Sequence, residues 1–153
     1  MTTSLQTKQD IETRVAGWVK TYADTITENY RRYHVETLEG NLSGNYPEYA
    51  RKQLDEIENG TANLMWFKVK TGKKYYKIVQ QEFETWEGSK YYNKYRDSSV
   101  HAFVDKKTGQ VYKPASWAAP AKHVRYDLRI IREREFLFNS NNTDWAGGYL
   151  YLR

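Results

Sequence analysis

Residues 10–34 carry apolar side chains at steps of three and four residues, the spacing that places them on one face of an α-helix. The pattern predicts a long amphipathic helix, whose apolar face needs a second layer to cover it. Gly40 and Gly44 end any continuation, because glycine disfavours a helix interior. The apolar face consists of Ile11, Val15, Trp18, Val19, Tyr22, Ile26, Tyr30 and Tyr33.

A second, shorter helix is predicted over residues 45–59. Asn45 is a good N-cap residue, and Pro47 suits the first turn because an N–H would have no helical partner there. Asn59 and Gly60 supply the stop signal. The turn-rich connection between the helices indicates that they pack antiparallel. The inner face of the second helix is expected to consist of Tyr49, Leu54 and Ile57.

After residue 60 the apolar spacing changes to that of strands. Residues 64–70 alternate in character, and a turn at residues 71–72 leads into a second strand over residues 73–83. The polar face of this hairpin is expected to carry lysines beside Tyr75 or Tyr76, depending on the register. A further hairpin is predicted over residues 100–113, with Gly109 in a left-handed turn conformation.

The remaining segments indicate less regular structure. Residues 86–99 are expected to form a loop, and the prolines within 114–122 break regular structure. Residues 125–138 fit either a helix or a strand, and a final short strand is expected over 149–152. The whole predicts a single α+β domain over residues 1–153, with two N-terminal helices packed on a small, mainly antiparallel β-sheet.

The chain has no cysteine, and no apolar segment of it approaches the length of a membrane span. Disulfides, thiolate zinc sites and cysteine nucleophiles are therefore excluded, and no membrane partner is expected. The first residues lack the apolar core of a secretion signal, so the expected location is the cytoplasm.

Charge is divided unevenly along the chain. Residues 1–60 hold 7 Lys/Arg against 10 Asp/Glu, whereas residues 61–153 hold 17 against 9, so the net charges are −3 and +8. The second part also holds 18 of the 24 aromatic residues. Cations that pair with phosphate and rings that stack on bases share this part, which indicates a nucleotide or nucleic acid as partner. The alternative is that the charge serves solubility and the tyrosines build the core.

Specific catalytic motifs are absent from the sequence. There is no Walker-type loop, no dinucleotide-binding glycine pattern, no His-Glu-x-x-His zinc motif and no Gly-x-Ser-x-Gly elbow. No catalytic residue, metal or cofactor is therefore predicted. A metal-dependent nuclease built from scattered acids is the remaining enzymatic alternative. The histidines and acids considered, whose spacing defines no site, are His34, His101, His123, Asp97, Asp105 and Asp127.

Residues 100–128 combine a hairpin with the runs Lys-Pro-Ala-Ser-Trp, Ala-Pro-Ala-Lys and Val-Arg-Tyr, in that order. This segment resembles one found in small, uncharacterised proteins of tailed bacteriophages, especially phages of marine bacteria. A weaker resemblance extends to residues 145–151. Those phage proteins commonly have a Lys after the Trp of the first run, where this chain has Ala118. The resemblance implies a phage-infected bacterial cell as the setting, and it implies no particular activity.

The same segment brings cations and aromatic rings close together in the sequence, a combination that binds nucleotides. Arg125 is included because a planar guanidinium can pair with phosphate and stack on a base. The structural alternative places Trp117 and Tyr112 in the core, with Lys106 and Lys107 at an exposed turn. The candidate ligand-binding residues are Lys106, Lys107, Tyr112, Lys113, Trp117, Lys122, His123, Arg125, Tyr126 and Arg129.

These features predict a non-enzymatic accessory protein of the phage type that binds a phosphate-bearing nucleotide. Sequestration of a signalling nucleotide of host defence is the role that such binding would serve. A homo-oligomer with the site at a subunit contact would suit sequestration, and the long N-terminal helix offers an apolar stripe for that contact. Two alternatives stay open: a single-stranded nucleic-acid-binding protein of phage replication or transcription, and a virion structural or assembly protein.

Overall fold

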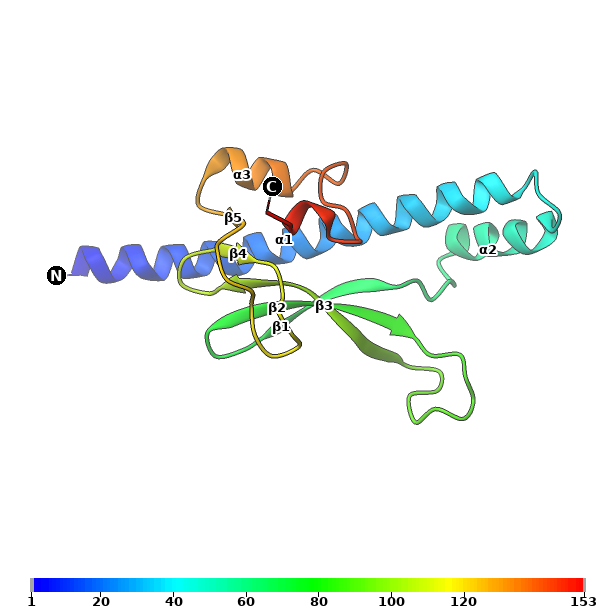
Figure 1. Cartoon of the computed structure of the whole chain (residues 1–153), viewed down its shortest axis with the longest axis horizontal. Coiled ribbons are helices and arrows are strands. Elements are labelled where there is room, and N and C mark those ends of the chain that lie inside the picture. Colours follow the sequence, from blue (N-terminus) through cyan, green and yellow to red (C-terminus); the bar gives the residue numbers. More distant parts are fainter. Residues whose placement is uncertain (1, 153) are drawn as a thin grey trace.

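The computed structural model describes the backbone of residues 2–152 and the side chains of residues 10–152. Two helices, α1 (Thr2–Asn41) and α2 (Pro47–Asn59), precede the strands. Figure 1 shows α1 extending beyond the sheet at both ends, with α2 folded back beside its far end. A short helix α3 (Ile131–Leu137) and a 3-10 turn η1 (Gly148–Leu150) follow the strands.

Within the described chain, five strands form one antiparallel sheet whose spatial order follows the order of the chain. The predicted α+β architecture, with two N-terminal helices and a mainly antiparallel sheet, is confirmed. The strands are β1 (Trp66–Thr71), β2 (Tyr75–Phe83), β3 (Tyr95–Asp105), β4 (Gln110–Tyr112) and β5 (Tyr126–Asp127).

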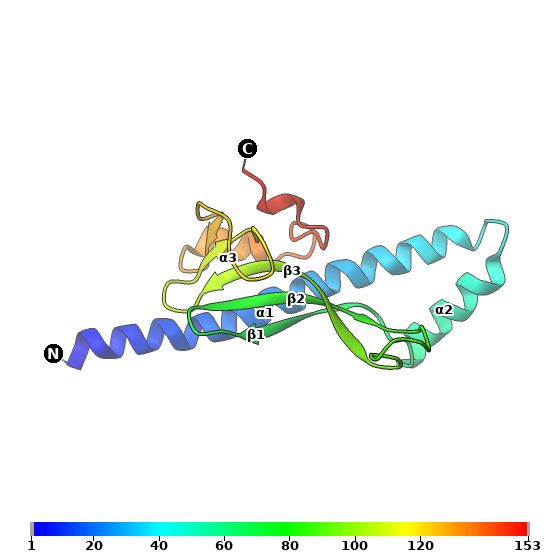
Figure 2. The ribbon, with the colours of Figure 1, turned by 60° about the horizontal axis from the view of Figure 1, so that its bottom comes forward.

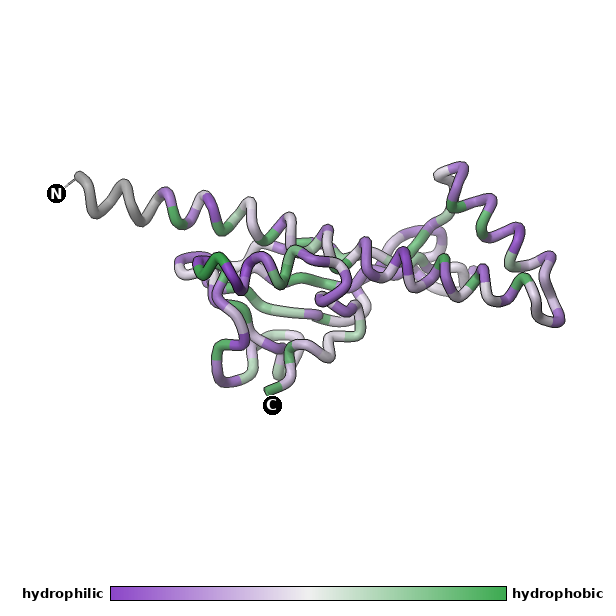
Figure 3. The backbone as a smooth tube through the Cα atoms, turned by 90° about the horizontal axis from the view of Figure 1, so that it is seen from above, coloured by the Kyte–Doolittle hydropathy of each residue, from purple (hydrophilic) through white to green (hydrophobic). Residues whose placement is uncertain are grey.

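One face of α1 builds the core together with the sheet. Its fully buried residues keep the predicted spacing of three and four; they are Val15, Val19, Tyr22 and Ile26. The strand residues of the same hydrophobic cluster are Phe67, Ile78, Ala102, Val104 and Val111. Figure 3 shows hydrophobic residues recurring along this helix. None of the described helices is apolar enough over a sufficient length to cross a membrane.

The two predicted hairpins of the sheet are confirmed. β1 and β2 pair from Trp66 with Gln81 to Thr71 with Tyr76. Tyr76 packs against the core cluster, so its neighbour Tyr75 lies on the opposite side of the sheet, where the lysines are. In the β3–β4 turn, Gly109 has a φ of +75°, the left-handed conformation predicted for it.

The pairing of β2 and β3 contains a register shift that adds an extra residue to β3. The pairing shifts between Ile78 and Val79 of β2, which leaves His101 as an extra residue in β3. In such a β-bulge two consecutive side chains can turn to the same side of a sheet. His101 accordingly lies on the α1 side with Ala102, and its ring contacts that of Phe67 at 5.2 Å between centroids.

The start of α2 corrects the predicted helix cap. Pro47 opens the helix as predicted, but the N-cap residue is Tyr46, without a side-chain hydrogen bond, rather than Asn45. The predicted stop is confirmed, because Gly60 has a φ of +77° and its N–H donates to carbonyl oxygens of the last turn.

The predicted inner face of α2 is wrong at Tyr49, which is 65% exposed. The buried residue of this helix is its neighbour Ala50. α2 also contacts α1.

Two predictions for the second half of the chain are wrong. Residues 95–99 belong to β3 rather than to a loop, because they pair with the end of β2. Residues 149–152 form no strand; Gly147, at a φ of +85°, turns the chain into η1, which buries Leu150. Residues 125–138, which fitted a helix or a strand, contain both, since β5 is followed by α3.

We expect Ile26→Ala to lower the free energy of unfolding by about 2–5 kcal/mol, because it leaves a cavity between α1 and the sheet. Urea denaturation followed by circular dichroism measures this change. Tyr46→Ala, at a position 81% exposed, serves as the control, and we expect it to change the same quantity by about 0.5 kcal/mol or less. A loss below about 1 kcal/mol for Ile26→Ala would contradict the packing of α1 on the sheet.

Candidate functional site

The two lysines of the β3–β4 turn have the contacts of turn residues. Asp105 Oδ1 accepts hydrogen bonds from the backbone N–H groups of Lys107, at 2.8 Å, and Thr108, at 3.1 Å. Lys106 Nζ donates to the carbonyl oxygen of Gly72 at 3.1 Å, which ties this turn to the β1–β2 turn. The geometry matches the structural alternative for both lysines.

Arg125 is also used within the fold. Its Nε donates to the carbonyl oxygen of Leu150 at 2.7 Å, and its Nη1 donates to the carbonyl oxygens of Lys122 and His123, each at 2.6 Å. His123 has a φ of +73°, so these bonds hold a strained turn in place. The guanidinium fastens the C-terminal segment to the loop before β5, and Lys122 and His123 themselves are exposed.

Two further candidate residues also contact neighbouring parts of the fold. Tyr126 donates its hydroxyl hydrogen to the carbonyl oxygen of Tyr149 at 2.8 Å, and its ring stacks on Phe136. Arg129 forms an ion pair with Asp127 at 2.8 Å. Both side chains thus have a structural role in the C-terminal part of the fold.

The last three candidates lie on opposite sides of the sheet. Tyr112 contacts the ring of Tyr75, and Trp117 lies with its ring centroid 4.6 Å from Lys77 Nζ, both on the side away from α1. Lys113 instead faces the C-terminal segment, where its Nζ lies 4.8 Å from the ring centroid of Tyr151. The ten predicted residues therefore do not form one site.

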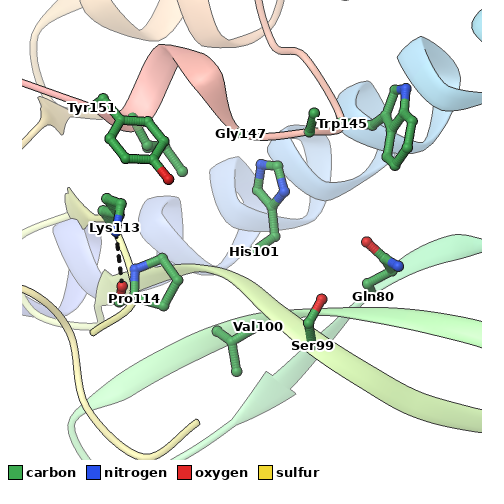
Figure 4. Close-up of a pocket in the computed structure, with 11 residues that line it drawn as sticks. Gln80, Ser99, Val100, His101, Lys113, Pro114, Trp145, Gly147 and Tyr151 are labelled. Atoms are coloured by element: carbon green, nitrogen blue, oxygen red, sulfur yellow. Dashed lines mark hydrogen bonds between the residues drawn. The ribbon is translucent and has the colours of Figure 1, made fainter. Parts of the chain in front are cut away.

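Lys113 lines a cavity between the sheet and the C-terminal segment, with a volume of about 380 Å³ (Figure 4). The floor is formed by residues 99–101 of β3, and Gln80 of β2 adjoins it. Lys113 and Pro114 form one wall, and the segment from Trp145 to Tyr151 forms the other. In Figure 4 the ring of Tyr151 and the side chain of Lys113 lie on the same side of this space.

A buried hydrogen-bonded chain supports this cavity. His101 Nε2 lies 2.7 Å from the Tyr149 hydroxyl oxygen, which lies 2.6 Å from the Tyr22 hydroxyl oxygen. The His101 ring also interacts with the backbone of Trp145. One arrangement of the protons satisfies all three side chains: Tyr22 donates to Tyr149, Tyr149 donates to His101 Nε2, and Nδ1–H is left for the Trp145 backbone. Every polar side-chain atom of Tyr22, Tyr149 and His101 then has a partner.

Burial sets the protonation of these three side chains. It lowers the pKa of His101 to about 4, only partly offset by the hydrogen bond to the Trp145 backbone. It also raises the pKa of Tyr22 and of Tyr149 above the ordinary phenol value. The three side chains of Tyr22, Tyr149 and His101 are therefore uncharged near pH 7. They join α1, β3 and the C-terminal segment without a buried charge.

The cavity itself offers one cation, one exposed ring and several polar groups. Among the described residues, Lys113 has no carboxylate within ion-pair distance. Tyr151 is 61% exposed. The amide of Gln80 and the hydroxyl of Ser99 can donate and accept hydrogen bonds. This set suits a ligand with an anionic end and a flat, polar-edged ring.

Sequence reasoning included Lys113 in its candidate set but missed the other cavity residues. Gln80 and Ser99 sit in ordinary strand positions and carry no motif. Trp145 and Tyr151 fall in the segment with the weaker phage resemblance, which was the one signal available for them. The expected strand over residues 149–152 hid the fact that Tyr151 follows a turn rather than a sheet.

The three histidines do not converge in the structure. His101 is in the core, His34 stacks on Tyr30, and His123 lies in an exposed loop. Among the residues that the structure describes, no group of three or more His, Asp or Glu side chains could hold a metal ion.

The chain belongs to a family of unknown function, DUF7717, whose model matches residues 1–152. The match includes α1 and α2 as well as the sheet and the C-terminal segment. Neither the curated proteins nor the solved structures contain a match to the chain. The chemistry of the site itself is therefore what indicates a function.

We expect Tyr149→Phe to lower the free energy of unfolding by about 1–3 kcal/mol for each buried group that it leaves unpaired, namely His101 Nε2 and the Tyr22 hydroxyl. Chemical denaturation at pH 7 measures this loss. Tyr112→Phe is the matched control, because among the described residues its hydroxyl bonds only to Gln110, at 3.3 Å, on the other side of the sheet. Equal stability of the two variants would contradict the hydrogen bonds that join Tyr22, Tyr149 and His101.

We expect acid to destabilise the fold through His101. Its pKa is about 4 in the folded state and about 6.5 when unfolded. Between these values only the unfolded state takes up the proton, so stability falls as the pH falls. The loss amounts to about 3 kcal/mol at pH 4. Urea denaturation of the wild type and of His101→Gln at both ends of this pH range tests this loss. The variant has no histidine at position 101 and should therefore lose less unfolding free energy on acidification. Parallel pH profiles would refute the assignment.

Proposed function

We propose that this protein binds a phosphate-bearing nucleotide in the cavity between β3 and the C-terminal segment, without converting it chemically. The observation that carries the proposal is the ammonium of Lys113, which lies beside the exposed ring of Tyr151 without an acidic partner among the described residues. Lys113 Nζ donates only to the Pro114 carbonyl oxygen, at 3.5 Å, among the described residues. A cation without an acidic partner there, beside an exposed ring, matches the two chemically distinct ends of a nucleotide.

Each part of the ligand has a plausible partner in the cavity. The phosphate pairs with Lys113 through a charge-assisted hydrogen bond. The base stacks on the ring of Tyr151, since aromatic faces stack on any base. Gln80 and Ser99, which line the cavity, bond to polar edges of the base or sugar. The volume of about 380 Å³ lies within the range of small-molecule sites.

The framework around the cavity supports binding without a large rearrangement. Residue 101 forms part of the floor, and its side chain is fixed by hydrogen bonds to Tyr149 and to the Trp145 backbone. Arg125 holds the carbonyl oxygen of Leu150 at 2.7 Å, which anchors the wall that carries Tyr151. A preformed site loses less free energy to ordering when its ligand binds.

The biological setting that we propose is a phage-infected bacterial cell, where the protein would remove a signalling nucleotide of host defence from solution. The support for this setting is the resemblance of residues 100–128 to small phage proteins. Lys113 and Pro114, which line the cavity, lie inside that segment.

We expect isothermal titration calorimetry with a panel of cyclic and linear nucleotides to detect a ligand. Lys113→Met should weaken the tightest ligand by about 10-fold to 150-fold, the effect of losing one hydrogen bond to a charged group. Tyr151→Ala should also weaken it, through the lost stack.

Lys122→Met is the matched control, because Lys122 is an exposed lysine outside the cavity. This variant should bind the nucleotide with the same affinity as the wild type. No heat with any nucleotide at micromolar protein, or equal affinities for the Lys113 and Lys122 variants, would rule out this site.

A further inference from the structure

The side of the sheet that faces away from α1 carries a second group of aromatic and basic side chains. We call it the outer face. Figure 2, in which the bottom of the molecule comes forward, gives a view of the strands from that direction. Since side chains alternate between the faces of a strand, the residues on the side opposite the core cluster belong to it. They include Trp66, Lys68, Lys70, Tyr75, Lys77 and Tyr112, and also Val79 and Phe103, which are themselves buried beneath their neighbours.

At one end of the outer face the rings are packed edge to face. The Tyr75 ring lies 5.7 Å from Phe103 and 6.1 Å from Tyr112, measured between centroids. The loop between β4 and β5 adds Trp117, whose ring lies 4.6 Å from Lys77 Nζ and which is 47% exposed. Trp117 is thus held in place while much of its surface is open to solvent.

A second aromatic group lies at the other end, where β2 and β3 extend past β1. The Tyr95 ring lies 6.3 Å from that of Trp66 and 5.3 Å from that of Phe83. The Tyr95 hydroxyl donates to the carbonyl oxygen of Leu64 at 2.9 Å, which fixes the orientation of its ring. Tyr95 is 36% exposed, so this group also presents a ring to solvent.

Lysines occupy the surface between the two aromatic groups. Lys70 pairs with Asp97, which also accepts a hydrogen bond from Gln81 at 2.8 Å. Lys68 and Lys77 form no ion pair with any described residue. Lys68, Lys70 and Lys77 share one carboxylate, Asp97, on which Lys70 and Lys68 both act electrostatically. Three lysines against one aspartate leave an excess of positive charge on the outer face, and phosphate is the complementary anion.

We propose that the outer face binds a single-stranded nucleic acid, with bases stacked on Trp117 and Tyr95 and phosphates paired with Lys68 and Lys77. Half-exposed rings need unstacked bases, which a single strand offers and a duplex does not. β2 spans about 26 Å at about 3.3 Å per residue. That length suits the footprint of about 4–16 nucleotides that single-strand binders cover. This site is separate from the nucleotide cavity, which lies on the α1 side of the sheet.

Fluorescence anisotropy with labelled oligo-dT and oligo-U of about 16 nucleotides, over a series of salt concentrations, tests the proposal. The logarithm of the binding constant should fall linearly with the logarithm of the salt concentration, with a slope of about −0.7 for each phosphate contact. Lys68→Gln should make the slope shallower by about 0.7. Trp117→Ala should lower the affinity by about 5-fold to 150-fold, the effect of losing one stacked base.

Matched controls separate this site from other surfaces. Lys52→Gln and Tyr46→Ala change exposed residues of the helical part and should bind the oligonucleotides as the wild type does. Lys113→Met should also leave oligonucleotide binding unchanged while it weakens mononucleotide binding, so the two proposals can fail independently. The outer-face proposal is overturned by absent binding at low salt, by unchanged binding of both Lys68→Gln and Trp117→Ala, or by equal affinity for duplex DNA. Equal binding of polyglutamate would also overturn it, because the partner would then be an acidic protein.

Discussion

The hydrogen-bonded chain of Tyr22, Tyr149 and His101 connects three parts of the molecule that are far apart in sequence. Tyr22 comes from the middle of α1, His101 from the bulge in β3 and Tyr149 from the C-terminal turn. Apolar packing holds α1 on the sheet and also buries Leu150 of the C-terminal segment. The hydrogen bonds among the three side chains add a directional constraint to this packing, because a polar atom buried without a partner costs free energy. These hydrogen bonds, together with the one from Arg125 to the Leu150 carbonyl oxygen, hold the cavity wall that the C-terminal segment forms.

The same alternation of side chains along the strands produces two different surfaces. Toward α1, the strands present apolar residues such as Phe67 and Val104, and the bulge adds His101. On the outer face, their neighbours are tyrosines, tryptophans and lysines. Some aromatic side chains therefore build the core, and others are partly exposed on the outer face. The charge asymmetry of the sequence is spatial as well, since the acidic part forms α1 and α2 and the basic part forms the sheet and the segments after it.

Local patterns were sufficient to predict most of the fold. The spacing from Val15 to Ile26 predicted the buried face of α1, and the glycine at position 109 predicted the turn between β3 and β4. The final segment could not be predicted in this way. Residues 149–152 have strand-like composition, but the left-handed Gly147 and the burial of Leu150 decide their conformation. The ten candidate residues do not gather at one place, which the sequence could not reveal because it depends on tertiary contacts: Arg125 donates to the Leu150 carbonyl oxygen, and Arg129 pairs with Asp127.

The central claim is that a nucleotide occupies the cavity on the α1 side of the sheet. Two-dimensional amide NMR with a mononucleotide identified by titration measures this most directly. The account predicts shifts concentrated at Gln80, Ser99, Lys113 and Tyr151, with Lys68 and Trp117 unaffected. Shifts confined to the outer face, or no shifts at saturating nucleotide, would contradict it.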